Sequence, residues 1–406
     1  MTIWKFPLTC AAKAAKTLKT GQSRPKTTPV SNEDQMHSLK TLSAAVFLGL
    51  SALTLVDMAF LRAGDQVLLP DNAYGPGKAF ALKELAQWGI SHAFYDPLNP
   101  ADLAARIGPA TRLVWIEAPG SITMEFPDVP ALVAVVRAAN AGRERPVVTA
   151  LDNTWGAGIA FQPFDQGVDV SIQALTKYPS GGADVLMGSV ITRDSDLHRQ
   201  ILLTRMRLGI GVGANDVELV LRGLPSMALR YHAQDASTRE LAAWMQQQPG
   251  VAQVLHPALP DSPGHAAWKR DATAAACLFS VVFDAAIPQA RVDAFCDSLR
   301  LFRLGWSWAG PVSLCAPYKL SSIRSQGWSD AGALVRFAIG LESVDDLRAD
   351  LAELGLAAEP RLDLEARIPV AWLLRHTAFY RWVVVAGGSL TIAVIGSIWL
   401  VERLGG

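Results

Sequence analysis

The chain has 406 residues, more than one hydrophobic core usually holds, so two domains with appendages are expected. Its 37 Lys and Arg residues balance 37 Asp and Glu residues, which excludes a global field that would attract nucleic acid or another polyanion. The four cysteines form no C-x-x-C pair and have no metal-ligand spacing to the histidines, a pattern typical of reduced cysteines in a cytosolic protein without a metal site.

The N-terminal segment 1–48 differs from the rest of the chain. Up to residue 32 it carries six basic residues and no acidic one, and no apolar run follows that would complete a secretory signal. This composition favours a disordered basic arm over a targeting peptide.

From residue 49 to about 230 the pattern alternates between helix and strand. Continuous apolar strands are predicted at "QVLLP" (66–70), "SHAFYD" (91–96), "RLVWIEAP" (112–119), "PVVTALDN" (146–153) and "DVSIQALT" (169–176), with helices at 51–64, 75–89 and 129–141 between them. Such an alternation is typical of an α/β fold with a mostly parallel sheet that is covered on both faces. The glycines of "GIGVG" (209–213) follow no strand, so they indicate a helix interruption and not a nucleotide loop.

The chain beyond residue 230 shows a different pattern of predicted helices and strands. Residues 231–358 show long helices and fewer strands, of which "LFSVVFD" and "LVRFAIGLES" are the clearest, and they predict a smaller α+β domain. A connector is expected at 359–381. Residues 382–401 contain no charge and are long enough to span a bilayer, with a cytoplasmic body before them; a buried helix or strand pair is the alternative.

Three reactive side chains follow predicted strands of the first domain. Lys177 comes after "SIQALT", Asp152 ends "VVTALD", and Tyr74 follows "QVLLP". Ligands of open α/β sheets bind outside the carboxyl ends of the strands, although a solvated lysine at a strand end is equally compatible with the segment alone. A lysine paired with a carboxylate suits pyridoxal 5'-phosphate (PLP), because the carboxylate keeps the ring nitrogen protonated. Tyr74 could stack on the ring or assist proton transfer.

Several motifs in order carry a resemblance to a known family. They are "IEAPGSITMEFPDVPALV", "LDNTWGAGIAF", "GVDVSIQALTKYPSGGADVLMGS", "HPALPDSPGHAAWKRD", "SWAG" and "RFAIGLESVDDLRADL". The chain from about residue 49 to 355 thereby resembles the cystathionine β-lyases, which are fold-type I PLP enzymes of cysteine and methionine metabolism. The resemblance implies an aminotransferase-like large domain with a seven-stranded sheet, a smaller C-terminal domain and a homo-oligomer.

The resemblance also implies a role for each residue that matches the family motifs. Lys177 would bind the cofactor covalently, take the α-proton of the substrate and return a proton to the leaving thiolate. Asp152 would pair with the ring nitrogen, and Tyr74 would stack on the ring. Thr176 and the backbone at Gly49 and Leu50 would hold the phosphate, the latter through N–H groups at a helix start. The substrate side would be formed by Arg336, which grips the α-carboxylate, with Ser307 and Trp308.

The implied reaction is β-elimination from cystathionine, which gives homocysteine, pyruvate and ammonia in methionine biosynthesis. Cystathionine γ-lyase or γ-synthase activity is the alternative within the same fold, and a membrane-tethered, impaired relic is the alternative outside it. The relic is considered because residues 1–48 lack the family's Tyr-x-Arg motif, which reaches the cofactor phosphate of a neighbouring subunit, and because the apolar tail extends past the usual family end. Weakened cofactor retention is therefore expected.

Overall fold

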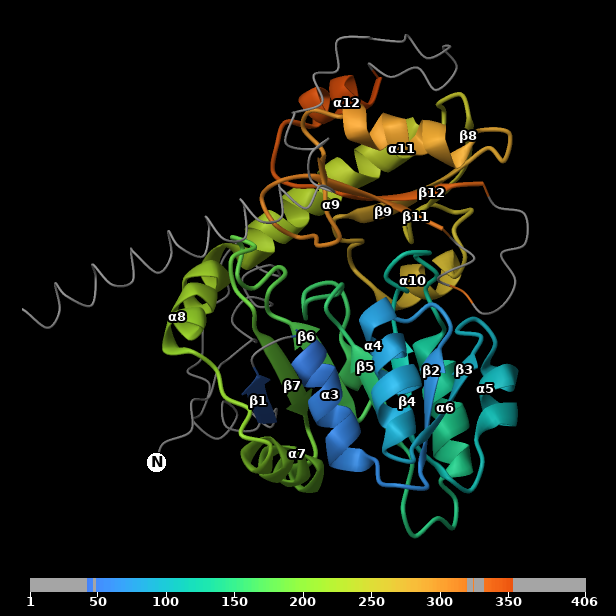
Figure 1. The fold of residues 1–406 in the computed structure, drawn as a ribbon, viewed down its shortest axis with the longest axis vertical. Helices are drawn as coiled ribbons and strands as arrows, with labels where there is room; N and C mark the ends of the chain where they lie inside the picture. The colour runs from blue at the N-terminus through green and yellow to red at the C-terminus, as the bar shows by residue number, and fades with distance from the viewer. Residues whose placement is uncertain (1–41, 47–48, 320–323, 325–331, 353–406) are drawn as a thin grey trace, which may run out of the picture. The chain divides into compact units, whose positions relative to one another are not determined.

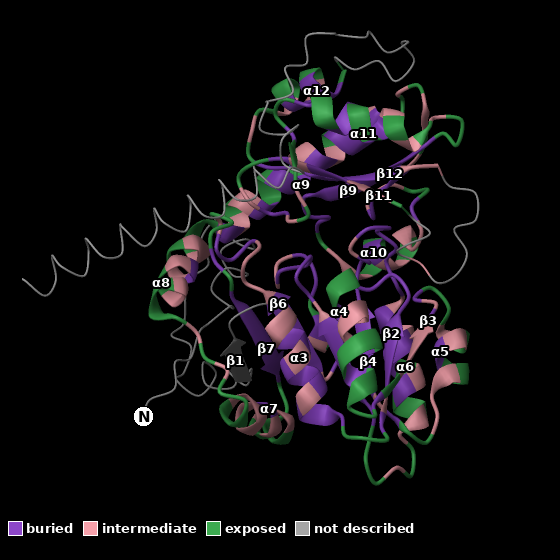
Figure 2. Cartoon of the chain, in the orientation of Figure 1, coloured by how far each residue is buried: buried purple, intermediate pink, exposed green. Residues whose placement is uncertain are grey.

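The computed structural model describes residues 42–46, 49–319, 324 and 332–352. Two β-sheets with flanking helices make up this part of the chain (Figure 1), and both lie within the same compact unit. The first sheet has seven strands and the second has five. Most positions in the strands of the first sheet are buried, whereas the helices over it bury one side and expose the other (Figure 2).

The seven-stranded sheet has the order β1-β7-β6-β5-β4-β2-β3. Its strands are β1 (Leu42–Val46), β2 (Gln66–Pro70), β3 (Ser91–Tyr95), β4 (Thr111–Glu117), β5 (Val148–Asp152), β6 (Val170–Ala174) and β7 (Gly188–Thr192). The five strands β2 to β6 run parallel, whereas β7 is antiparallel to β6 and β1 is antiparallel to β7. The mostly parallel sheet expected from the apolar strands is confirmed. Part of the predicted basic arm, residues 42–46, is its edge strand.

Helices connect the strands and cover the sheet. They are α3 (Gly49–Phe60), α4 (Gly75–Phe80) continued by a π-helical turn η1 (Ala81–Leu85), α5 (Pro100–Arg106), α6 (Val129–Ala139), α7 (Ser195–Arg207) and α8 (Ala214–Gly223), with 3-10 turns η2 (Pro163–Gln166) and η3 (Leu224–Ser226). Local sequence explains the starts: the Asp128 carboxylate caps α6 by accepting the N–H of Ala131 at 3.1 Å, and Pro130 occupies the first turn. The "GIGVG" glycines lie between α7 and α8, as predicted.

The second sheet follows the long helix α9 (Met227–Met245). Its order is β10-β11-β12-β9-β8, with strands β8 (Val251–Leu255), β9 (Leu278–Phe283), β10 (Arg303–Leu304), β11 (Leu314–Tyr318) and β12 (Leu334–Ala338) and helices α10 (His265–Asp271), α11 (Gln289–Ser298) and α12 (Val344–Ala352). The sequence predicted only β9 and β12 clearly, because β10 is two residues long and β8 mixes polar with apolar residues. The proposed boundary at residue 230 stays a prediction.

Apolar packing joins the helices to both sheets. One buried cluster includes Val56 of α3 and Leu113 and Ala150 of the first sheet, and another includes Leu241 of α9 and Phe337 of β12. Within the described residues, no helix is both long and apolar enough to cross a bilayer. The predicted connector 359–381 and the apolar stretch 382–401 lie outside these residues.

Candidate active site

The first sheet places the predicted residues at the carboxyl ends of its parallel strands. Asp152 is the last residue of β5, Lys177 follows the end of β6 by three residues, and Tyr74 follows the end of β2 by four. Parallel strands direct their carboxyl ends to one edge of the sheet, so these side chains converge there. The second sheet contributes Arg336 on β12, and the segment between β10 and β11 contributes Ser307 and Trp308.

Lys177 lies in a tight turn where the two sheets meet. Its backbone N–H bonds to the carbonyl of Ala174 at 3.2 Å, and its Nζ donates to Ser307 Oγ at 2.7 Å. The Nζ also lies 5.1 Å from the centre of the Trp308 ring. Burial and the nearby Arg336 charge lower the pKa of the Lys177 amine to about 8. The amine is therefore available in its neutral form close to neutral pH.

The neighbouring Tyr178 anchors this turn. Its ring is fully buried, lies 5.9 Å from the Trp308 ring, and its hydroxyl accepts the backbone N–H of Cys277 at 2.9 Å. The lysine turn is thus fastened to the start of β9 in the second sheet. This contact restricts the backbone conformation around Lys177. The Lys177 amine itself keeps its polar contact with Ser307 Oγ.

Asp152 presents a carboxyl group without a bonded cation among the described residues. Its Oδ1 accepts the backbone N–H of Thr154 at 2.9 Å and also the Thr154 hydroxyl. Burial raises the pKa of the Asp152 carboxyl, while the Thr154 bonds and the Lys177 charge oppose the rise. A carboxyl group in such a setting is suited to receive a cationic N–H.

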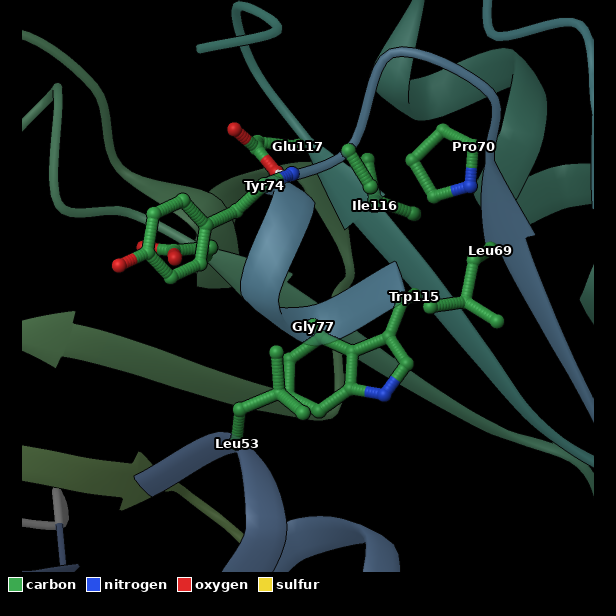
Figure 3. Close-up of a pocket in the computed structure, with 10 residues that line it drawn as sticks. Leu53, Leu69, Pro70, Tyr74, Gly77, Trp115, Ile116 and Glu117 are labelled. Atoms are coloured by element: carbon green, nitrogen blue, oxygen red, sulfur yellow. Dashed lines mark hydrogen bonds between the residues drawn. The ribbon is translucent and has the colours of Figure 1, made fainter. Parts of the chain in front are cut away.

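Tyr74 stands at the start of α4 with its side chain 43% exposed. Its backbone N–H donates to Glu117 Oε2 at 2.7 Å (Figure 3). Burial and the Asp152 charge raise the pKa of the Tyr74 phenol, so the hydroxyl is protonated near neutral pH. A ring held open to the pocket in this way can stack on a flat ligand.

Arg336 is buried, although an arginine within the run "LVRFAIG" would by itself indicate an exposed position on a strand. It is only 4% exposed, because β12 lies between β11 and β9 in the second sheet. Its Nη1 donates to the carbonyl of Ser121 at 3.0 Å and its Nη2 to the carbonyl of Trp306 at 2.8 Å. The buried Nε has no hydrogen-bond partner among the described residues and is therefore open to a further acceptor.

The phosphate side of the predicted site brings α3 against the end of β6. A Cβ added to Gly49 would lie 2.7 Å from the Cβ of Ala174, so only glycine fits this approach. The N–H groups of the first turn, Gly49 and Leu50 among them, have no partner within the helix. Thr176 follows Ala174 by two residues, and its Oγ1 accepts the N–H of Met187 at 3.2 Å. A helix N-terminus is a common anion site.

Sequence reasoning missed Glu117, which pairs in register with Asp152. It is 9% exposed and lines the same pocket as Tyr74 and Asp152. Burial and the Asp152 charge raise the pKa of the Glu117 carboxyl to about 8. The signal was present, because Glu117 ends its strand "RLVWIE" just as Asp152 ends the next one.

These residues fit PLP. The site combines a lysine of lowered pKa, a carboxyl group without a bonded cation among the described residues, a partly exposed phenol and the start of helix α3 against the end of β6. On a mostly parallel seven-stranded sheet with a smaller second sheet, they define a fold-type I PLP-dependent enzyme.

Comparison with known proteins gives the family. The sequence matches the family described as "Cys/Met metabolism PLP-dependent enzyme" over residues 23–355, and the chain belongs to this family. It is 40% identical to a cystathionine beta-lyase of Salmonella typhimurium over 75% of this chain and 77% of the relative. A cystathionine beta-lyase of Escherichia coli is 39% identical over 75% and 76%. The crystal structure of a cystathionine gamma synthase from Xanthomonas oryzae pv. oryzae superposes with a TM-score of 0.70 at 30% identity, over 77% and 80%.

Proposed function

We propose that this chain is a carbon–sulfur lyase that catalyses β-elimination of L-cystathionine, which consumes one water and gives L-homocysteine, pyruvate and ammonia. The observation that carries the proposal is the meeting of Lys177 from the first sheet with Ser307 from the second, beside Arg336 and Asp152. The names of the relatives that are 39–40% identical support the β-lyase reading over the γ-synthase reading.

The cofactor, when bound, supplies an electron sink that makes the α-proton of an amino acid removable. Asp152 would hold the ring nitrogen protonated, and Tyr74 would hold the ring from one face. Gly49, Leu50 and Thr176 would bind the phosphate. Lys177 would bind the cofactor covalently and transfer protons.

Lys177 would transfer the protons, because the pKa of its amine is lowered from 10.5 to about 8. When not bonded to the cofactor, the neutral Lys177 amine would accept the α-proton and would then donate a proton to the departing sulfur. Ser307 receives a hydrogen bond from Nζ at 2.7 Å and would keep the amine directed into the site. The Trp308 ring lies 5.1 Å from Nζ and packs against the amine on one side.

Arg336 would orient the substrate by binding its α-carboxylate. Two of its nitrogens are fixed by the carbonyls of Ser121 and Trp306, so the guanidinium has one orientation, and the unpaired Nε remains to bind a carboxylate. Fixing the α-carboxylate orients the bond from the α-carbon to its hydrogen toward the reacting group.

The test is the keto acid formed by the purified, cofactor-loaded chain from cystathionine. Pyruvate indicates β-elimination, and 2-oxobutyrate would instead assign γ-elimination. Absence of both, with the cofactor bound, would point to the impaired relic. A parallel assay with cystine and other thioethers would define the substrate range.

Two narrower proposals concern assembly and location. A homo-oligomer is proposed from the family resemblance, and gel filtration with light scattering tests it. A membrane tether through 382–401 is proposed from the uncharged apolar run alone. Cell fractionation of the full chain beside a version ending near residue 360 tests the tether, because only the full chain should sediment with membranes.

A further inference from the structure

Glu117 connects the two sides of the candidate site. Its Oε2 accepts the backbone N–H of Tyr74 at 2.7 Å, and interaction with the neighbouring Ser121 lowers the pKa of the same carboxyl group. The carbonyl of the same Ser121 accepts Nη1 of Arg336 at 3.0 Å. One buried carboxyl group therefore touches the residue that carries the stacking ring and, through Ser121, the guanidinium on the opposite side.

The Tyr74 ring has few other constraints. Its hydroxyl makes no hydrogen bond to another described residue, and its side chain is 43% exposed. The backbone is held on both sides: the Tyr74 carbonyl accepts the N–H of Gly77 at 2.9 Å in the first turn of α4, and the Tyr74 N–H is held by Glu117. No side chain caps α4, so the Glu117 bond is what fixes the entry of the chain into the helix.

The sheet fixes Glu117 itself. It is the last residue of β4 and pairs in register with Asp152 of β5, so both side chains arise at the same level of the sheet. Glu117, Asp152 and Tyr74 line one pocket, whose remaining walls include Leu53 and Trp115 (Figure 3). A substitution of Glu117 would therefore affect Tyr74 by removing the hydrogen bond between them, and not by altering the packing of the hydrophobic core.

We infer that Glu117 is a positioning residue of this site: it holds Tyr74 in place for the cofactor ring and, through Ser121, steadies Arg336 for the substrate carboxylate. The inference rests on the site roles proposed above. Its main readout is cofactor binding without substrate, so a failed cystathionine assay would leave the test intact.

The test is a double-mutant cycle on cofactor affinity, measured by titrating cofactor-free protein with PLP and following the visible absorbance and circular dichroism of the bound cofactor. Glu117→Ala leaves the Tyr74 N–H unpaired and is expected to weaken affinity about 10-fold. The same substitution in a Tyr74→Ala background should have less than about a 2-fold effect, because the ring it positions is absent. Glu117→Gln keeps an oxygen acceptor and should stay within about 3-fold of the original protein.

Two controls separate positioning from general destabilisation. Asp350 is likewise buried and accepts backbone N–H groups, those of Arg300 and Leu301 at 2.9 and 2.8 Å, but it lies on α12 beside the second sheet. Asp350→Ala should lower the melting temperature and leave cofactor affinity unchanged. If Glu117→Ala does not fold, Glu117→Leu fills the space without an acceptor and takes its place in the cycle.

A secondary readout addresses Arg336. In the loaded enzyme, Glu117→Ala should raise KM for the amino-acid substrate more than Glu117→Gln does. The inference is overturned if Glu117→Ala weakens cofactor affinity by the same factor with and without the Tyr74 ring. It is equally overturned if Glu117→Gln loses as much affinity as Glu117→Ala, because charge and not position would then be responsible.

Discussion

The Nζ of Lys177 donates a 2.7 Å hydrogen bond to Ser307 Oγ across 130 residues of sequence. Lys177 follows a strand of the seven-stranded sheet, and Ser307 precedes a strand of the five-stranded sheet. Neither sheet holds the site alone.

The Lys177 amine should control how fast cofactor-free protein takes up PLP. Burial and Arg336 lower the pKa of this amine from 10.5 to about 8, and only the neutral amine attacks an aldehyde. The uptake rate should rise about tenfold for each pH unit below the pKa and level off above pH 8. Stopped-flow absorbance measures it, and a rate that keeps rising to about pH 10 would show an ordinary lysine.

Asp152→Asn should lower the rate of β-elimination about 100-fold while the cofactor still binds. A neutral amide cannot hold a proton on the ring nitrogen, so the electron sink weakens. The matched control is Asp169→Asn, because the Asp169 carboxylate accepts the Thr149 N–H at 2.8 Å near the amino end of the strands. That variant should lose stability and keep its kcat. Equal kcat losses in both variants would contradict the assignment.

Arg336→Lys should raise KM about 30-fold with a smaller fall in kcat. An ammonium cannot bond the Ser121 and Trp306 carbonyls and a substrate carboxylate in one plane as the guanidinium can. Arg145→Lys serves as control, since Arg145 forms a two-nitrogen pair with Asp65 away from the site. Steady-state kinetics decides: an unchanged KM in Arg336→Lys would remove Arg336 from substrate binding.

His256 should make the protein sensitive to mild acid. Burial lowers the pKa of its ring to about 3 in the folded state, against 6.5 when unfolded. Below pH 6.5 the His256 ring is protonated in the unfolded chain but stays neutral in the folded chain down to about pH 3. The free energy of unfolding therefore decreases as the pH falls below 6.5. From pH 7 to 5 this single group accounts for about 2 kcal/mol of unfolding free energy. Urea unfolding of His256→Gln should show a correspondingly smaller loss, and an identical loss would refute the effect.

The residues of the first sheet could be predicted from sequence for a physical reason. Parallel strands alternate with helices along the chain, so every strand end falls at the same edge, and Lys177, Asp152 and Tyr74 converge without further information. Glu117 obeys the same rule. A lysine and one carboxylate already meet the needs of the cofactor ring, so the sequence pattern indicates no role for a second carboxyl group.

The burial of residues in the second sheet could not be predicted from the sequence. A strand such as "LVRFA" looks half-exposed when its neighbours are unknown, and only the pairing of β12 with both β11 and β9 buries Arg336. Its role entered through the family resemblance and not through the pattern. The meeting of Ser307 with Lys177 likewise depends on how the two sheets pack, which no local pattern encodes.

Reductive trapping identifies the lysine that carries the cofactor. Borohydride treatment of the PLP-loaded chain, followed by proteolysis and mass spectrometry, fixes the cofactor on the lysine that holds it. The label is expected on Lys177, with the exposed Lys83 unlabelled. Label on another lysine, or none on a chain that still converts cystathionine to pyruvate, would contradict it.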